Sequence, residues 1–266
     1  MILLLALQLV AGPAQVAVSP AQHYENAKQD FAQKKFSEAV SEVDTALHDS
    51  PYMVPALVLK ARLAVFAHRP DVAKSCLITA IKADPTSGEA QFFLGVFYYT
   101  QNDFKLAISP LQAAQTLSPK SPLPVFYLAM TQESLGNETK ALELYQQAEN
   151  LSLEKSPQRA LLLLAYGRFL LALGRSQDGI EKVRQSIEDD PKSREAHYEL
   201  AKALDQEGDL KNAALEAELA LPLPELSTGD AQIHFLLAKI YRKLKQPELA
   251  KAYLDKFKAD PQTALR

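Results

Sequence analysis

The chain has 266 residues, and its 29 basic and 32 acidic side chains give a formal net charge of -3 at pH 7. No long basic stripe stands out, which removes the electrostatic argument for nucleic-acid binding, and we expect no nucleic-acid partner. The chain has one cysteine, which excludes an intramolecular disulfide, and 47% hydrophobic residues, which is enough for a continuous core.

The first nineteen residues differ from the rest of the chain. Residues 2–10 are almost wholly apolar, Gly12-Pro13-Ala14 follows, and a polar stretch begins at Ser19. This order resembles a secretory signal peptide, although no Lys or Arg precedes it. We expect residues 1–19 to act as a signal peptide that is cleaved after Ala14, so that the protein is periplasmic or secreted. The alternatives are an uncleaved membrane anchor, although a span needs ~20 apolar residues, and a buried N-terminal cap on a cytoplasmic protein.

From residue 20 onward the chain repeats itself. Pro51, Pro85 and Pro119 are spaced 34 residues apart. Small residues recur in two columns twelve positions apart, and both columns step by 34, 34, 34, 38, 34 and 37 residues, so insertions after the fourth and sixth repeats explain every departure. The first column is Ala27, Ala61, Gly95, Ala129, Gly167, Ala201 and Ala238, and the second is Ala39, Ala73, Ala107, Ala141, Gly179, Ala213 and Ala250.

Each repeat is predicted to be a helical hairpin. Apolar residues follow helical spacing, as Phe93, Val96 and Phe97 do in the third repeat. Small residues are needed where two helix axes approach to about 8 to 10 Å. Polar or helix-stopping pairs mark the reversal of the chain: Lys34-Lys35, Arg69-Pro70, Asn102-Asp103, Gly136-Asn137, Gly174-Arg175, Gly208-Asp209 and Gln246-Pro247. The sequence therefore predicts seven hairpins over residues 20–261 and a C-terminal tail over residues 262–266.

The third repeat carries the clearest motif. It reads Leu94-Gly95-x2-Tyr98, then Ala107-x3-Leu111, Ala114 and Pro119. This pattern and the period of 34 resemble the tetratricopeptide repeat family, although no Trp occurs in the chain. The resemblance implies an all-α fold, a right-handed superhelical array of helical hairpins, with the first helix of each hairpin lining a concave surface.

Residues for catalysis or metal binding are scattered. The five histidines lie in different repeats, with no pair spaced four residues apart. No Gly-rich phosphate loop follows a predicted strand, and Asp189-Asp190 precedes Pro191 at an expected helix end, where a solvated acidic turn is the ordinary interpretation. We therefore predict no enzymatic activity, no cofactor and no metal site.

Two columns on the first helices are candidates for partner contact. They lie three residues before and one residue after each small residue, and the resemblance implies that they face the concave groove. The alternative for the earlier column is that its rings cover the adjacent helix. The candidates are Tyr24, Val58, Arg62, Phe92, Val96, Phe126, Met130, Leu164, Arg168, Tyr198, Lys202, Phe235 and Lys239.

These features predict a non-catalytic scaffold or adaptor that binds a peptide or protein segment in its concave groove, in the bacterial cell envelope. One alternative is a substrate-recruiting or regulatory subunit of an envelope enzyme or of a secretion or assembly complex, and another is a cytosolic co-chaperone. Membrane-associated proteins are among the expected partners. The last hairpin is expected to bind a partner or a second copy of the chain through Tyr253, Leu254 and Phe257, because only nine residues follow its second helix.

Overall fold

The computed structural model describes residues 18–152, 154–224 and 228–260. These ranges contain fourteen α-helices and no strand, which confirms the predicted all-α architecture of seven hairpins. Within them, no helix combines the length and the apolar character that crossing a membrane would need. Residues 1–17 of the expected signal peptide over residues 1–19, and the expected tail over residues 262–266, lie outside the described residues.

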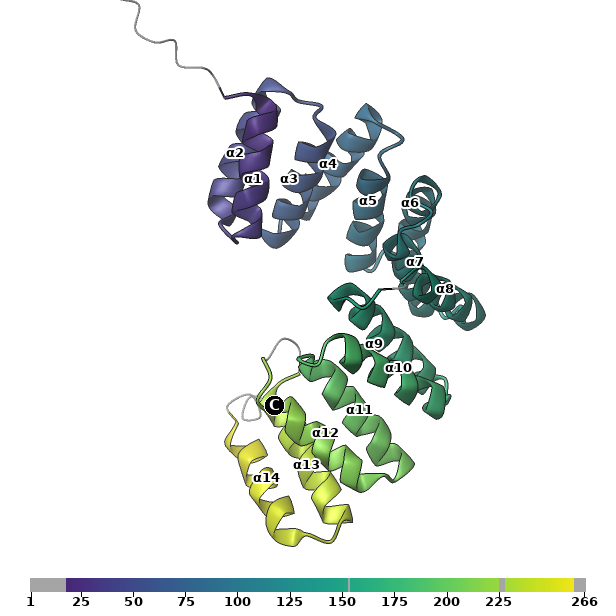
Figure 1. Ribbon diagram of the computed structural model, residues 1–266. Coiled ribbons are helices and arrows are strands. Elements are labelled where there is room, and N and C mark those ends of the chain that lie inside the picture. The colour runs from purple at the N-terminus through teal and green to yellow at the C-terminus, as the bar shows by residue number, and fades with distance from the viewer. Residues whose placement is uncertain (1–17, 153, 225–227, 261–266) are drawn as a thin grey trace, which may run out of the picture. The chain divides into compact units, whose positions relative to one another are not determined.

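The helices form two compact units, one ending at Ser118 and the other beginning at Pro119 (Figure 1). Unit 1 contains α1 (Pro20–Ala32), α2 (Phe36–Asp49), α3 (Val54–Phe66), α4 (Pro70–Ala83), α5 (Gly88–Thr100) and α6 (Phe104–Leu117). Unit 2 contains α7 (Pro122–Ser134), α8 (Glu138–Leu151), α9 (Pro157–Ala172), α10 (Ser176–Asp189), α11 (Arg194–Glu207), α12 (Leu210–Ala220), α13 (Asp230–Lys243) and α14 (Pro247–Ala259).

Local sequence signals account for where the helices begin and end. The side chain of Ser87 accepts a hydrogen bond from the backbone N–H of Ala90 at 3.2 Å, which satisfies one of the free N–H groups at the start of α5. Inside each hairpin one residue adopts a left-handed conformation, and these residues step along the chain with the two small-residue columns. They are Lys34, His68, Asn102, Gly136, Gly174, Gly208 and Lys245. The predicted turns are confirmed at all seven places.

The two small-residue columns lie where the helices of each hairpin pack together. Every member of both columns is buried except Ala250, which is half-buried. A side-chain carbon added to Gly167 in α9 would lie 2.9 Å from the backbone oxygen of Gly179 in α10. The predicted close approach of paired helices is therefore confirmed.

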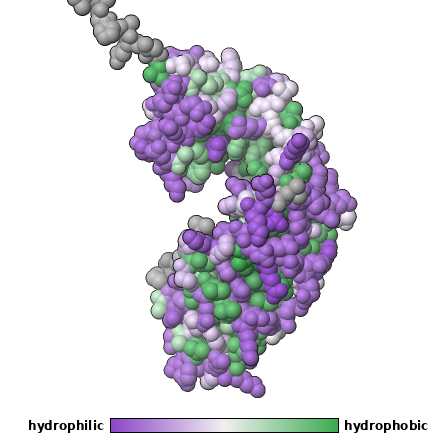
Figure 2. All heavy atoms as spheres, viewed as in Figure 1, coloured by the Kyte–Doolittle hydropathy of each residue, from purple (hydrophilic) through white to green (hydrophobic). Residues whose placement is uncertain are grey.

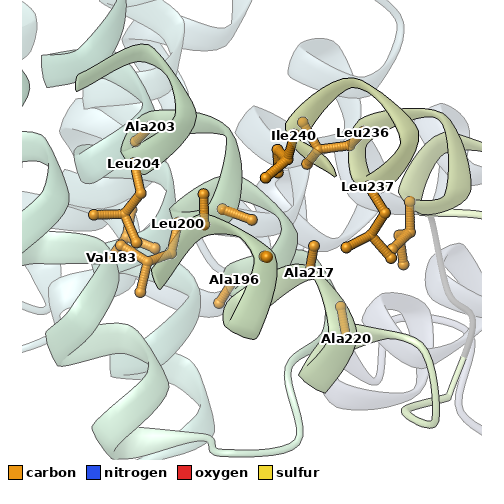
Figure 3. Close-up of a cluster of buried hydrophobic side chains, with 14 of the residues drawn as sticks. Val183, Ala196, Leu200, Ala203, Leu204, Ala217, Ala220, Leu236, Leu237 and Ile240 are labelled. Carbon is orange, nitrogen blue, oxygen red and sulfur yellow. The ribbon is translucent and has the colours of Figure 1, made fainter. Parts of the chain in front are cut away.

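Each unit has its own hydrophobic core, built from successive hairpins. In unit 2, Val183 of α10, Leu200 of α11, Ala217 of α12 and Leu237 of α13 belong to one buried cluster (Figure 3). Hydrophilic residues cover α8 and α10 on the face shown in Figure 2. These two second helices are thus polar outside and contribute buried apolar residues to the cores between hairpins, so each hairpin stabilises the next one.

Candidate functional site

The first helices of successive hairpins pack against one another within each unit. In unit 1 these are α1, α3 and α5, and in unit 2 they include α9, α11 and α13 (Figure 1). We call the surface that they form in each unit the first-helix face of that unit. One pocket on the face of unit 1 and one on the face of unit 2 differ in chemistry.

The pocket of unit 1 is mainly apolar and has a volume of about 320 Å³. We call it the apolar groove. Arg62 and Val96 line it, and both were predicted to contact a partner. The other lining residues are Phe31, Ala61, Val65, Phe66, Leu77, Phe93, Phe97 and Thr100.

An aromatic cluster extends the apolar groove toward solvent. The Phe66 ring stacks on the Phe36 ring with 5.3 Å between centroids, and it meets the Phe31 ring edge-on at 5.7 Å. Phe66 nevertheless remains 60% exposed. Its ring is held by two aromatic neighbours and still presents a large apolar surface to a partner.

Arg62 is the charged residue of the apolar groove. The central carbon of its guanidinium lies 4.6 Å from the centroid of the Phe31 ring and 5.0 Å from that of Phe93. A guanidinium over an aromatic ring is stabilised by about 0.5 to 1 kcal/mol at an exposed site. The two rings therefore hold the guanidinium beside the pocket that Arg62 lines.

The pocket of unit 2 is charged and has a volume of about 250 Å³. We call it the charged groove. Arg168 of α9 lies 3.0 Å from a carboxylate oxygen of Glu195 and 3.6 Å from one of Glu199, both in α11. Lys202 lies 2.9 Å from the other oxygen of Glu199. Acidic side chains of α11 therefore pair with both predicted cations of this groove.

A second set of ion pairs links α11 to α13. The Asp205 carboxylate is 2% exposed and accepts Lys239 at 2.9 Å and Lys243 at 2.6 Å. Burial alone would raise the pKa of Asp205, but hydrogen bonds from Lys243 and Lys239 outweigh it, so the pKa lies below its usual value. The predicted cation Lys239 thus has a structural partner.

Titratable groups do not gather into a metal site in the described part of the chain, since no three His, Cys, Asp or Glu residues are placed to hold an ion. The groove of unit 1 presents mainly apolar surface, and the groove of unit 2 presents cations that are already paired with carboxylates.

Models of the tetratricopeptide repeat match residues 58–122, 164–228 and 231–258, which together make up more than half of the sequence. The chain belongs to the tetratricopeptide repeat family. Proteins of this family serve as scaffolds that bind protein or peptide partners, and the fold is generally non-catalytic.

Similar proteins include both a curated relative and solved tetratricopeptide structures. The DnaJ homolog subfamily C member 7 homolog of Dictyostelium discoideum is 25% identical over 220 residues, which cover 78% of this chain and 40% of that protein. This chain therefore spans less than half of that relative's length.

Three structures resemble the fold at lower identity. The Cut9–Hcn1 hetero-tetramer of the APC/C matches with a TM-score of 0.75 and 17% identity, over 85% of this chain and 43% of that one. PilF of Pseudomonas aeruginosa matches with a TM-score of 0.66 and 17% identity, over 75% of this chain and 88% of that one. YrrB, described as having an unusual peptide-binding site, matches with a TM-score of 0.57 and 16% identity, over 73% of this chain and 97% of that one. Identities this low establish a shared tetratricopeptide fold and nothing further.

Two of the predicted contact residues are buried in the cores. Val58 and Leu164 are at most 4% exposed, and each belongs to a core cluster. Phe126 also belongs to a core cluster, but it lines a further pocket of about 340 Å³ in unit 2. The burial of Val58 and Leu164 corrects the expectation that every member of the earlier column lines a surface. An apolar side chain at this position fills the space toward neighbouring helices, as the alternative interpretation of the column held.

The remaining predicted residues differ in exposure and in what they contact within their own unit. Tyr24 is half-buried beneath Lys28, and Phe92 is half-buried with its ring edge-on to Phe93. Met130 is half-buried against the core of unit 2, and Tyr198 is half-buried beneath Lys202. Phe235 is exposed, and its ring lies 5.2 Å from that of Phe257. The structure brings together Arg62 with Val96, and Arg168 with Lys202.

The predicted self-association of the last hairpin remains a prediction.

Sequence reasoning missed the residues that give each groove its character. These are Phe31, Val65 and Phe66 in unit 1 and Glu199 in unit 2. Phe31 and Val65 lie one helical turn after the small residue of their repeats. The same position holds Leu171 in the fifth repeat, which lines the charged groove, so this column alone does not separate the two kinds of groove.

Asp205 leads to a pH-dependent prediction. The Asp205→Asn variant should lose about 1 to 3 kcal/mol of unfolding free energy at pH 7, because charge-assisted hydrogen bonds disappear from a buried site. A carboxyl whose pKa is lower in the folded chain stabilises the fold above its unfolded pKa of about 3.9, and this contribution is lost as pH falls through the folded value. Urea unfolding from pH 7 to pH 3 should therefore show the variant and the wild type converging.

The exposed carboxylate of Glu143 in α8 provides the control. Glu143→Gln should match the wild type within about 0.5 kcal/mol at pH 7. A constant difference between Asp205→Asn and the wild type down to pH 3 would show that the ion pairs do not stabilise this fold.

Proposed function

We propose that this tetratricopeptide repeat chain is a non-catalytic adaptor that binds a segment of a partner protein in the apolar groove of unit 1. The observation that carries the proposal is an open apolar pocket of about 320 Å³ beside the 60% exposed Phe66. Covering this surface removes apolar area from water, which is favourable by about 25 cal/mol per Å².

The charged groove of unit 2 is less suited to the same task. Arg168, Lys202 and Lys239 already have carboxylate partners within the unit. A ligand would have to replace existing ion pairs with equivalent ones, so its net gain there is small. We therefore assign binding to unit 1.

The expected affinity follows from opposing contributions. Ordering an extended segment costs about 1 to 2 kcal/mol per residue in backbone entropy. Each large apolar side chain that the groove buries returns about 1.5 to 3 kcal/mol. A lone peptide should therefore bind with a dissociation constant on the order of micromolar.

The test is a selection from a random peptide library displayed on phage, with the whole chain immobilised. Enriched peptides should bind the free protein in fluorescence anisotropy, and Phe66→Ser should weaken them about tenfold or more, because a partner would then bury a small polar side chain in place of the ring. Phe66 is largely exposed, so its replacement should leave the fold intact.

Leu106→Ser is the matched control, because Leu106 of α6 is also an exposed large apolar residue of unit 1 but does not line the apolar groove. It should leave peptide affinity unchanged. If no peptide is enriched, or if both variants weaken binding equally, the apolar groove is not the binding site.

The same proposal places the adaptor in the bacterial cell envelope, where a membrane-associated protein or a secretion or assembly complex would supply the partner. The support is the sequence of residues 2–10, which are almost wholly apolar, followed by Gly12-Pro13-Ala14. Intact-mass analysis of the protein from a bacterial envelope fraction should show a new N-terminus at Gln15. A retained Met1 would contradict export with cleavage and would favour the anchored or cytosolic alternative.

A cytosolic co-chaperone is the second candidate, and the similarity to a Dictyostelium DnaJ homolog favours it. The two candidates differ in where the protein is found. Fractionation of bacteria expressing the full sequence should place it outside the cytoplasm if it is an envelope adaptor. Recovery in the cytosolic fraction would favour the co-chaperone.

A further inference from the structure

We infer that the partner segment presents a carboxylate beside a large apolar side chain, with the carboxylate bound to Arg62 and the apolar side chain buried in the apolar groove. This inference rests on the proposed function and adds the chemistry of the ligand to it. It concerns Arg62, whose positive charge has no carboxylate partner among the described residues.

Arg62 differs from the other three cations among the predicted contact residues. Arg168, Lys202 and Lys239 each lie within 4.0 Å of a carboxylate oxygen in unit 2. Arg62 occupies the same repeat position as Arg168, one residue after the small residue, but no ion pair or hydrogen bond of its guanidinium is found among the described residues. Its neighbours are instead the rings of Phe31 and Phe93.

The geometry of the guanidinium carries the second step. An arginine head group has five N–H donors. Those of Arg62 make no hydrogen bond to the described residues, and the contacts of its central carbon with the Phe31 and Phe93 rings do not satisfy them as a carboxylate would, so they remain able to donate hydrogen bonds to a ligand. Arg62 itself lines the apolar groove, so these donors lie at the edge of the pocket.

A ligand that fills the apolar groove also removes water from Arg62. Arg62 is half-buried, so part of its side chain is accessible to solvent. A purely apolar ligand over Phe66 and Val96 would remove that water and leave a charged group without acceptors, which is strongly unfavourable. A ligand carboxylate would replace the water with charge-assisted hydrogen bonds, and a basic ligand would add repulsion.

The test uses three dye-labelled peptides that are capped at both ends and share a central phenylalanine. Glutamates flank the phenylalanine in the acidic probe, glutamines in the neutral probe and lysines in the basic probe. By fluorescence anisotropy the acidic probe should bind the full chain about tenfold more tightly than the neutral one, as expected for hydrogen bonds to a charged group. The basic probe should bind more weakly than either.

Arg62→Gln should abolish the preference for the acidic probe, whereas Arg62→Lys should retain part of it. Arg168→Gln is the matched control, since it removes a cation from the same repeat position in unit 2, and the preference should survive it. Thermal unfolding of Arg62→Gln checks that the fold is retained. A preference that persists in Arg62→Gln overturns the inference.

The remaining outcomes separate this inference from the proposed function. Equal binding of the acidic and neutral probes, together with its loss in Phe66→Ser, overturns the carboxylate inference and leaves the apolar groove as the binding site. Failure of all three probes to bind overturns the inference as well, and the phage selection then decides independently about the groove.

Discussion

Gly167→Leu should lower the free energy of unfolding of unit 2 by about 3 kcal/mol or more. A side-chain carbon at Gly167 would lie 2.7 Å from a methyl carbon of Val183 and 2.9 Å from the backbone oxygen of Gly179. A side chain such as Val183 can shift, but the backbone of α10 can move only if the hairpin opens. Urea unfolding should show the loss, and hydrogen exchange should accelerate in α9 and α10.

Two comparisons sharpen this prediction. Leu161→Ala changes a largely exposed residue of the same helix and should alter stability by less than about 0.5 kcal/mol. At Gly95 the added carbon would meet the side chain of Leu111 at 2.4 Å, and its nearest backbone contact is at 3.2 Å. Gly95→Leu should therefore be less damaging than Gly167→Leu. An unchanged unfolding midpoint for Gly167→Leu would contradict the packing described for this hairpin.

The hairpins could be predicted from the sequence because their determinants are local and recur. The small residues, the turn residues and the helical spacing all lie within one repeat, and seven copies fix the register. His68 and Lys245 show how strongly the register acts, since both adopt the left-handed turn conformation that glycine takes in other repeats.

The chemistry of the grooves could not be predicted in the same way, because it depends on contacts between repeats. Arg168 lies on a first helix, but its partners Glu195 and Glu199 come from the next hairpin. A single column of aligned residues contains the positive charge and not the carboxylates that pair with it. The sequence therefore predicts cations that are available to a partner, whereas in the structure those of unit 2 are paired within the unit.

The position of the family's characteristic Trp, four residues before the small residue of the first helix, shows that contacts within a repeat are also hard to predict from the sequence. His23 and His197 occupy that position in the first and sixth repeats. His23 Nδ1 lies 2.6 Å from a carboxylate oxygen of Glu42, and His197 Nδ1 lies 2.7 Å from one of Glu216. The polar pair crosses from the first helix to the second where the family usually packs an aromatic ring. The motif identified the position, and only the structure identified what replaces it.

Tyr145→Ala should destabilise unit 2 by about 3 to 5 kcal/mol, the usual cost of removing a buried aromatic side chain. Tyr145 of α8 is fully buried, and its ring stacks on Tyr166 of α9 with 5.2 Å between centroids. The ring centroids of Phe169 in α9 and Phe126 in α7 lie 5.5 Å and 6.2 Å from that of Tyr145. One side chain therefore joins the α7–α8 hairpin to α9, next to the insertion that follows the fourth repeat.

The hydroxyl group and the ring make separable contributions. The Tyr145 hydroxyl donates a hydrogen bond to Glu133 at 2.5 Å. Tyr145→Phe keeps the ring stack and leaves the exposed Glu133 to water, so it should cost only about 1 kcal/mol. Urea unfolding measures both losses, and hydrogen exchange should show Tyr145→Ala opening α7 and α8 before the rest of unit 2. Equal losses for the two variants would mean that the hydrogen bond, and not the ring stack, holds this hairpin in place.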